Sequence, residues 1–527
     1  MSIRRSIAGV VMIVALMSGS IPAQTDELGQ GVMLLNQGDY DGAIVQLLAA
    51  LKKNPSSFKA AMGLGNAYFL TDDYDKAVVY FEKAHGLNPA DVGAASNLAT
   101  VYTAQGKSDK ALELYTQVVK SNPGNAEPYN GLGAIEQSLG NYDKAIAQYK
   151  KAISLVQTEA RYYVNLGKVY ELMNNAGEAA LWYEKALTVN GKSVEAILAL
   201  GVLDKNASQY EKARAHFQQV LQINPSSWEA QRQLGILLEI QGSLDGAINR
   251  YNQALKSGKA DLREVLSALG AVYAKKGDFE SAAASYRQLL IKFPALDEIH
   301  GELGVVLFRS GNFFEAVQEL KKGLQQDSAN IRFLSALGDA YMALQRYDMA
   351  VACYEDVLKT EPDHIPARLQ LGILAYNKAD YNRAEKYLRG VLAINPATVD
   401  AGYYVALILI QRKRFDEAIT MLEELKSYAG SDARVFYGLG MAYGRLNNLQ
   451  KAVEMLTKAV SLNDKLADAH WELAKIYEQT NYRDMQYKEL RKILEIDKNH
   501  PLKASIKAKL QILRDDGIIK NDEWQNF

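Results

Sequence analysis

The sequence has few of the residues on which metal, disulfide and thiol chemistry depend. Its 527 residues include a single cysteine, Cys353, which excludes an internal disulfide and any multi-cysteine metal site. The six histidines are scattered, and none stands in an HExxH motif or another metal-ligand spacing. We therefore predict no cofactor and no metal, and we interpret Cys353 as a small buried side chain rather than a reactive thiol.

An excess of one charge and long apolar runs are also lacking. The 60 Lys and Arg residues balance 61 Asp and Glu residues, and no basic block marks a face that would bind nucleic acid. The longest apolar run, at 7–17, is too short to span a bilayer comfortably. We predict no nucleic-acid partner, and no stable membrane span once the leader is removed.

Residues 1–23 have the pattern of a secretory signal peptide. Arg4 and Arg5 supply the positive start, the apolar run follows, and Ser18–Ala23 supplies small and helix-breaking residues before a polar stretch. We predict cleavage after Ala23 and export to the periplasm or the cell exterior. An uncleaved N-terminal anchor is the alternative.

What the sequence has in abundance is repetition with a period of 34 residues. The segment Phe58–Asp91 predicts two amphipathic helices that break at Asp72-Asp73 and end before Pro89. Helices this short cannot bury their apolar faces alone, so the copies are expected to stack. The alanine at the twentieth position of this segment recurs at intervals of 34, with one interval of 35, as Ala43, Ala77, Ala111, Ala145, Ala179, Ala213, Ala247, Ala282, Ala316, Ala350, Ala384, Ala418 and Ala452.

Two further positions predict how the helices of a pair meet. The twenty-fourth is usually Phe or Tyr, and we expect these rings to lie in the core. A glycine inside a helix costs roughly 1 kcal/mol relative to alanine, so a recurrent glycine indicates close helix approach. The eighth position is glycine in most copies: Gly31, Gly65, Gly133, Gly167, Gly201, Gly235, Gly270, Gly304, Gly338, Gly372 and Gly440.

The ends of the repeats carry their own signals. Seven prolines share one phase, after the second predicted helix: Pro55, Pro89, Pro123, Pro225, Pro294, Pro362 and Pro396. Two residues further on, Ser57, Asn125, Ser227 and Thr398 are predicted N-caps of the next helix.

This pattern resembles the tetratricopeptide repeat family over about residues 24–500, which we number as repeats 1–14. The resemblance implies an all-α fold, a right-handed α-solenoid (superhelix) of about 14 helix-turn-helix repeats. It also implies that the first helices line a concave groove that binds peptides or proteins. Leu502, Ile506, Leu510 and Leu513 form an apolar stripe, which predicts a capping helix at 501–517 before a polar tail at 518–527.

The one irregular interval lies near 257–262, where a residue is inserted and the proline is missing. It predicts a seam between repeats 1–7 and 8–14. A slightly longer loop without structural consequence is the alternative.

No catalytic signature is present, and we predict that the protein is not an enzyme. The glycines occur singly at a packing position, so they do not form a phosphate-binding loop. His300 and His470 share the fourth position of the repeat with Tyr129 and Tyr163, which indicates a packing role.

A known subclass of the family holds a peptide carboxylate with two asparagines and several cations. Asn66 and Asn97 match the two asparagines, but Met62, Glu127 and Gly131 stand where the cations would be. Without cations a buried carboxylate pair would not be neutralised, so this use of the groove is rejected.

The expected groove lining changes along the array. Repeats 4–8 offer a mixed, somewhat acidic set of polar residues, whereas repeats 9–14 offer large apolar and aromatic groups, which carry most interface energy. Burial of some of these groups against neighbouring repeats is the alternative. The predicted protein-binding residues are Phe308, Met342, Tyr376, Tyr403, Tyr404, Ile410, Tyr437, Met441 and Trp471.

These features together predict an exported, non-enzymatic scaffold or adaptor that binds protein or peptide partners, as part of a larger envelope complex. Two alternatives stay open. One is a periplasmic scaffold for the export or assembly of polysaccharide or cell-wall polymer. The other is an accessory subunit that regulates a separately encoded enzyme.

Overall fold

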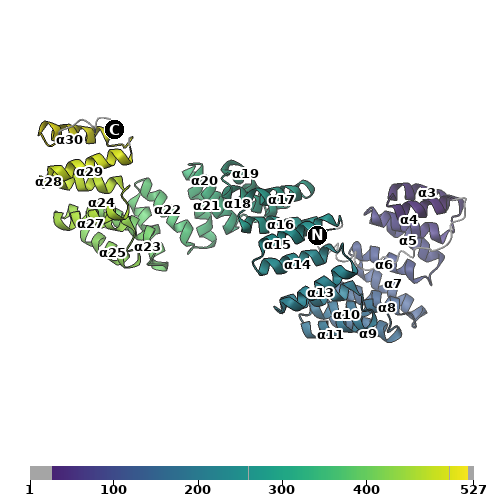
Figure 1. Ribbon diagram of the computed structural model, residues 1–527. Coiled ribbons are helices and arrows are strands. Elements are labelled where there is room, and N and C mark those ends of the chain that lie inside the picture. Colours follow the sequence, from purple (N-terminus) through teal and green to yellow (C-terminus); the bar gives the residue numbers. More distant parts are fainter. Residues whose placement is uncertain (1–25, 259, 498, 520–527) are drawn as a thin grey trace. The chain divides into compact units, whose positions relative to one another are not determined.

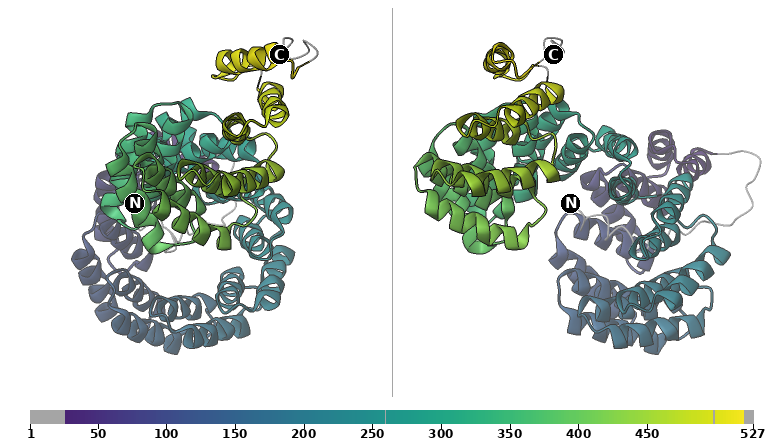
Figure 2. Two further views of the ribbon diagram at one scale, coloured as in Figure 1. Left: turned by 90° about the vertical axis from the view of Figure 1, so that its left-hand side faces the viewer. Right: turned by 60° about the vertical axis from the view of Figure 1, so that its left-hand side comes forward.

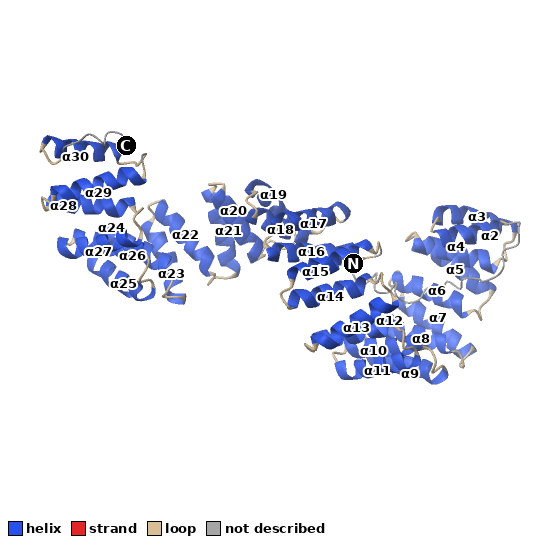
Figure 3. Ribbon diagram, viewed as in Figure 1, coloured by secondary structure: helices blue, strands red, loops and turns tan. Residues whose placement is uncertain are grey.

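The computed structural model describes residues 26–258, 260–497 and 499–519, and all regular secondary structure in these ranges is α-helical (Figures 1 and 3). The predicted signal peptide, 1–23, and most of the polar tail lie outside the described residues. The chain divides into two compact units, 1–261 and 262–527, and the division lies in the irregular interval of the repeat.

The first unit holds seven helix pairs, one for each of repeats 1–7. The helices are α2 Glu27–Gln37, α3 Tyr40–Lys53, α4 Phe58–Leu70, α5 Tyr74–Leu87, α6 Val92–Ala104, α7 Ser108–Ser121, α8 Ala126–Ser138, α9 Tyr142–Leu155, α10 Ala160–Leu172, α11 Ala176–Val189, α12 Val194–Asn206, α13 Tyr210–Ile223, α14 Trp228–Ile240 and α15 Leu244–Lys256.

The second unit holds the pairs of repeats 8–14 and one more helix. These helices are α16 Leu262–Lys276, α17 Phe279–Lys292, α18 Asp297–Arg309, α19 Phe313–Gly323, α20 Ile331–Ala343, α21 Tyr347–Thr360, α22 Ile365–Asn377, α23 Tyr381–Ile394, α24 Val399–Gln411, α25 Phe415–Tyr428, α26 Ala433–Arg445, α27 Leu449–Leu462, α28 Ala467–Gln479, α29 Arg483–Ile496 and α30 Lys503–Asp515.

Within each unit the helix pairs stack in chain order (Figure 2). Inside a unit, each helix packs on its partner in the pair, and the second helix of a pair packs on the first helix of the next. Several first helices also contact the next first helix, as in α4 with α6, and α24 with α26. The fold is therefore an α-solenoid, and we call the side on which these even-numbered helices adjoin the first-helix face.

The eighth-position glycine is the place where the two helices of a pair meet. A Cβ atom added to Gly235 would lie 2.6 Å from a ring carbon of Tyr251, the twenty-fourth residue of the same repeat. The same contact joins Gly65 to Phe81 at 2.5 Å, and leucine replaces the ring in repeats such as the one containing Gly440. The predicted close approach is confirmed, and so is the burial of these rings, because Tyr251 is fully buried.

Repeat 3 shows how the array accommodates an exception. Its eighth residue is Ala99 instead of glycine, and the bulky partner is Tyr115. The Tyr115 ring lies against Gly131 at the start of the next repeat, where an added Cβ would be 2.7 Å from the tyrosine hydroxyl oxygen. The small residue that contacts this ring therefore belongs to the next helix pair, and the tyrosine is still buried.

The glycine contact yields a matched pair of substitutions in the first unit. Gly235→Ala should destabilise it by about 1–3 kcal/mol, because the new methyl group overpacks the Tyr251 ring. Gly86→Ala should be neutral or stabilising by up to roughly 1 kcal/mol, since no heavy atom lies within 4 Å of the added Cβ in that helix. Urea unfolding followed by circular dichroism measures both; equal losses would contradict the packing role.

The turn inside each pair requires one residue with left-handed backbone. The fifteenth position has a positive φ in every repeat, and it is glycine in repeats such as the one containing Gly311. Several repeats place an ordinary L-residue there, including Ala379 with φ 57° and Lys413 with φ 61°. This conformation costs an L-residue roughly 1–2 kcal/mol, so these turns are imposed by the packing of the helices they join.

Substitutions at two of these turns measure the free-energy cost of positive φ for an L-residue. Ala379→Gly should stabilise the second unit by roughly 0.5–1 kcal/mol, because glycine adopts positive φ freely. Gly311→Ala, at φ 84° with open space around the new Cβ, should destabilise it by a similar amount. Thermal and urea melts of the two variants give the comparison, and a stability loss for Ala379→Gly would contradict it.

Most of the predicted helix N-caps and the predicted burial of the single thiol are found in the structure. Ser57, Asn125 and Ser227 accept backbone N–H hydrogen bonds at the starts of their helices, as predicted. Thr398 stands at the N-cap of α24 but its side chain makes no capping hydrogen bond. Cys353 is 8% exposed, and burial raises the pKa of its thiol to about 11, which leaves it protonated and unreactive at neutral pH.

One more helix, α30, follows the last pair. Its apolar stripe packs on the second helix of repeat 14, α29, through the fully buried Ile506, Leu510 and Leu513, with Leu490 and Ile493 opposite them. The helix thus covers apolar surface that a further repeat would otherwise have to bury.

Candidate functional site

The nine predicted binding residues all lie on first helices of the second unit, from α18 to α28. Eight of them are half-buried, so part of each side chain is accessible. Ile410 is different, because it is 5% exposed and belongs to the apolar core around α24 and α25. Ile410 is therefore a packing residue, and we leave it out of the candidate site.

Position twelve of the repeat explains why Ile410 is buried. Side chains at this position lie near the end of the first helix and pack against the start of the second. The ring centroids of Phe308 and Phe313 are 5.8 Å apart, and those of Tyr376 and Tyr381 are 5.7 Å apart. Part of each such side chain is committed to its own helix pair.

Four tyrosines come together where α22, α24 and α26 adjoin. Tyr376 and Tyr404 meet edge to face with centroids 5.1 Å apart, and Tyr403 meets Tyr404 at 5.7 Å. Tyr437 lies one repeat beyond Tyr403 at the same repeat position, and Trp471 lies one repeat beyond Tyr437. We call Tyr376, Tyr403, Tyr404, Tyr437, Met441 and Trp471 the tyrosine surface.

The hydroxyl groups of this surface have no hydrogen-bond partner among the described residues. Several fully buried tyrosines of the core differ, since Tyr183 donates to Glu171 at 2.8 Å and Tyr354 donates to Asp339 at 2.6 Å. Burial raises the pKa of Tyr403 and Tyr437 well above the usual range, so both hydroxyls stay protonated. Each is a neutral donor that solvent or a ligand can satisfy.

A charged group that the sequence did not single out adjoins these rings. The guanidinium of Arg434 lies 5.6 Å from the centroid of Tyr403 and pairs with Asp400 and Asp432, each at 2.7 Å. The hydrogen bond from Arg434 holds the pKa of the Asp432 carboxyl below its usual range. The signal that could have found this group is the second position of the repeat, which carries Asp400, Arg434 and Asp468 in succession.

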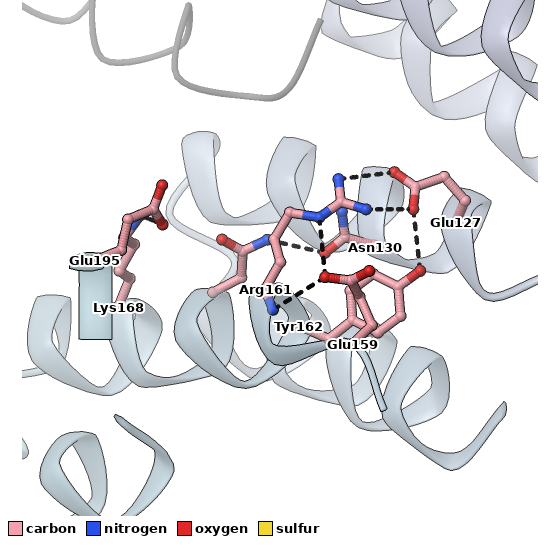
Figure 4. Close-up of polar contacts among 8 residues, drawn as sticks. Glu127, Asn130, Glu159, Arg161, Tyr162, Lys168 and Glu195 are labelled. Atoms are coloured by element: carbon pink, nitrogen blue, oxygen red, sulfur yellow. Dashed lines mark hydrogen bonds and ion pairs between the residues drawn. The ribbon is translucent and has the colours of Figure 1, made fainter. Parts of the chain in front are cut away.

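On α8, α10 and α12, within the repeats 4–8 predicted to have a polar lining, polar groups of the first-helix face bind one another (Figure 4). Arg161 donates two hydrogen bonds to Glu127, at 3.1 and 2.8 Å, and Tyr162 donates to the same carboxylate at 3.0 Å. Lys168 pairs with Glu195 at 3.4 Å. The charged and polar groups of these side chains are therefore paired with one another within the protein.

The same holds for the amides on this face. Asn97 donates to Asn66 at 3.1 Å, and Asn165 donates to Asn130 at 2.9 Å. The two asparagines that match a carboxylate clamp therefore bind each other, consistent with the rejection of that use.

The predicted packing role of His300 and His470 is confirmed. His470 bonds Glu489 through Nδ1 and the Asp464 carbonyl through Nε2, at 3.1 Å for the latter. His300 makes the corresponding contacts: Nδ1 bonds Glu319, and Nε2 bonds the Pro294 carbonyl. The tyrosines at this position make the equivalent bond, since Tyr163 donates to the Gln157 carbonyl. These side chains hydrogen-bond to the turn before each helix and hold it in place.

Among the described residues no cluster of His, Cys, Asp or Glu could hold a metal.

The contact of Glu319 with His300 predicts a pH dependence of stability. Burial alone would raise the pKa of Glu319, but hydrogen bonds from Lys322 and His300 outweigh it and lower that pKa. A lowered folded-state pKa adds stability above the unfolded-state value, and this contribution disappears as the pH falls through the folded-state value. The stability difference between the parent and Glu319→Gln should therefore shrink as the pH falls below about pH 4. Urea unfolding at a series of pH values measures this difference, and a difference that grows below pH 4 would contradict the prediction.

Family models described as tetratricopeptide repeat match the chain at 28–92, 69–135, 124–190, 205–272, 267–331, 307–372, 375–440, 433–466 and 467–500. With the fourteen stacked helix pairs, these matches show that the chain belongs to the tetratricopeptide repeat family.

Individual relatives are distant. BBSome complex member BBS4 of Bos taurus is 22% identical over 50% of this chain and 51% of its own length. Type IV pilus assembly protein PilF of Pseudomonas aeruginosa is 26% identical over 34% of this chain and 71% of its own. The chain spans about half the length of the first curated relatives it matches.

Among solved structures, the chain is similar to the APC/C hetero-tetramer Cut9-Hcn1. The match covers 91% of this chain and 95% of the other with 16% identity and a TM-score of 0.41, too low to support a conclusion about function. Among the described residues, no helix is long and apolar enough to cross a membrane.

Proposed function

We propose that the protein is a non-enzymatic scaffold whose principal partner site is the tyrosine surface. The observation that carries this proposal is the contrast between the two first-helix faces. The polar groups on α8, α10 and α12 bind one another, whereas the hydroxyls of Tyr403, Tyr404 and Tyr437 have no partner among the described residues. Partly exposed aromatic rings with free donors are typical of residues that dominate protein interfaces.

The partner is a protein segment that lies along the adjoining helices α22, α24, α26 and α28. Successive first helices present Tyr403, Tyr437 and Trp471 at the same repeat position, so a segment running along the stack would meet one ring in each repeat. Several modest contacts on one rigid surface add up to useful affinity. Family membership supports a protein partner of this kind.

We further propose that the protein acts outside the cytoplasm. The basis is the signal pattern at 1–23, with Arg4 and Arg5 before the apolar run. The likeness to PilF, named as a type IV pilus assembly protein, favours a role in assembling a bacterial envelope structure over an intracellular one. Attachment of polysaccharide to the tyrosine rings is the competing use of the same surface.

The test is capture of partners by the full chain in its native envelope. The variant Tyr403→Ala/Tyr404→Ala/Tyr437→Ala should lose most captured protein, because three aromatic contacts are removed, each worth about 1–2 kcal/mol in an interface. A matched control, Phe314→Ala/Tyr428→Ala, removes two exposed aromatic side chains from second helices of the same unit and should keep the partner. Cross-linking followed by mass spectrometry measures both.

Three outcomes distinguish the alternatives. Loss of protein capture in the triple variant alone supports the proposal. Unchanged protein capture contradicts it. Retention of polysaccharide with no protein partner, abolished by the triple variant, would replace it with the competing use.

A further inference from the structure

The two units carry the same arrangement of charges eight repeats apart. In the first unit, Arg161 pairs with Glu127 of the preceding repeat at 2.8 Å, and its Nε lies 4.0 Å from Glu159 at the start of its own helix. In the second unit the corresponding residues are Arg434, Asp400 and Asp432, and Arg434 pairs with both carboxylates. Each arrangement thus holds one guanidinium between two carboxylates on the first-helix face.

A third carboxylate follows in the next repeat, and here the two units differ. In the first unit it is Glu195, whose carboxylate accepts an ion pair from Lys168 at 3.4 Å (Figure 4). In the second unit it is Asp468, which makes no ion pair with any described residue. The residue that corresponds to Lys168 is Met441, which carries no charge. The cation that completes the arrangement in the first unit is therefore absent from the second.

Aromatic residues occupy the repeat positions next to the carboxylate that lacks a cation. Three residues after Asp468 on the same helix face comes Trp471, and one repeat earlier the same position carries Tyr437. The Asp468 charge lies close enough to act on the hydroxyls of both Tyr403 and Tyr437. The faces of such rings attract cations. In the first unit these aromatic positions are occupied by Asn130, Val164 and Leu198 instead.

The other charged groups nearby leave a net negative charge. Arg434 is shared between Asp400 and Asp432. Glu472, the next acidic residue on α28, pairs with Lys475 at 2.6 Å and with Arg445 at 3.9 Å. Asp468 remains as an exposed carboxylate in the first turn of α28.

We propose that the tyrosine surface recognises a protein segment through a lysine or arginine side chain, whose cation pairs with Asp468 between the rings of Tyr437 and Trp471. This inference rests on the proposed function and names the chemistry of the partner. The ligand supplies in the second unit the cation that Lys168 supplies within the first. An acidic or uncharged segment would leave Asp468 unpaired.

The experiment is a selection from a random peptide display library on the full chain. Binders of the parent protein should be enriched in Lys and Arg. Asp468→Asn should remove that enrichment, and synthetic copies of the selected peptides should bind this variant about tenfold more weakly. Met441→Lys should have the same effect, because it places an internal cation where the first unit has Lys168. Met349→Lys is the matched control, because it adds the same charge at an exposed methionine on the second helix α21, away from the tyrosine surface, and it should behave as the parent.

The outcomes separate this inference from the proposed function. Binders that require Tyr403 and Tyr437 but show no basic enrichment, or bind Asp468→Asn as well as the parent, overturn the inference and leave the proposed function standing. Binders that are insensitive to the triple tyrosine variant overturn both. Asp468 is exposed and Met441 is half-buried, and thermal melts of each variant confirm that the fold is kept.

Discussion

The contact between an eighth-position glycine and the twenty-fourth-position side chain, an aromatic ring or a leucine, is the constraint on which the rest of the structure depends. Gly235 and Tyr251 leave no space for even one added methyl group, and the same holds from Gly31 to Gly440. Because each helix pair is held at the same close distance, successive pairs stack in the same way and present matching positions on the first-helix face. Where glycine gives way to alanine, as at Ala99, the tyrosine packs on the next pair instead, which keeps the stack continuous.

Since the packing positions are fixed by stacking, the residues that differ between copies carry the functional information. The charges around Arg161 and Arg434 show this directly, because the two units repeat the same ion pairs and then depart from each other at one step. Lys168 completes the first arrangement, and Met441 leaves the second open. A repeat protein thus provides an internal comparison: one copy shows which interaction the other copy lacks.

Much of the fold could be predicted from the sequence, because the period of 34 residues fixes both helix length and the spacing of small and large residues. The close approach at Gly65 and the burial of Phe81 were predicted in this way and are confirmed. The left-handed turn at Ala379 could not be predicted, since alanine carries no local preference for positive φ and the helices on either side impose it. At the site, Ile410 was wrongly grouped with accessible residues, and the ion pairs of Arg434 depend on distances between repeats that spacing alone does not give.

If partners bind the tyrosine surface of the second unit and not the corresponding face of the first, photo-cross-linking inside cells should distinguish the two faces. A benzophenone side chain is placed at Trp471 in one version of the full chain and at Leu198 in another. These residues occupy the same repeat position eight repeats apart, and both are half-buried. We expect a discrete protein adduct from position 471 and none from position 198. A protein adduct from position 198, or none from position 471, would contradict binding at the tyrosine surface.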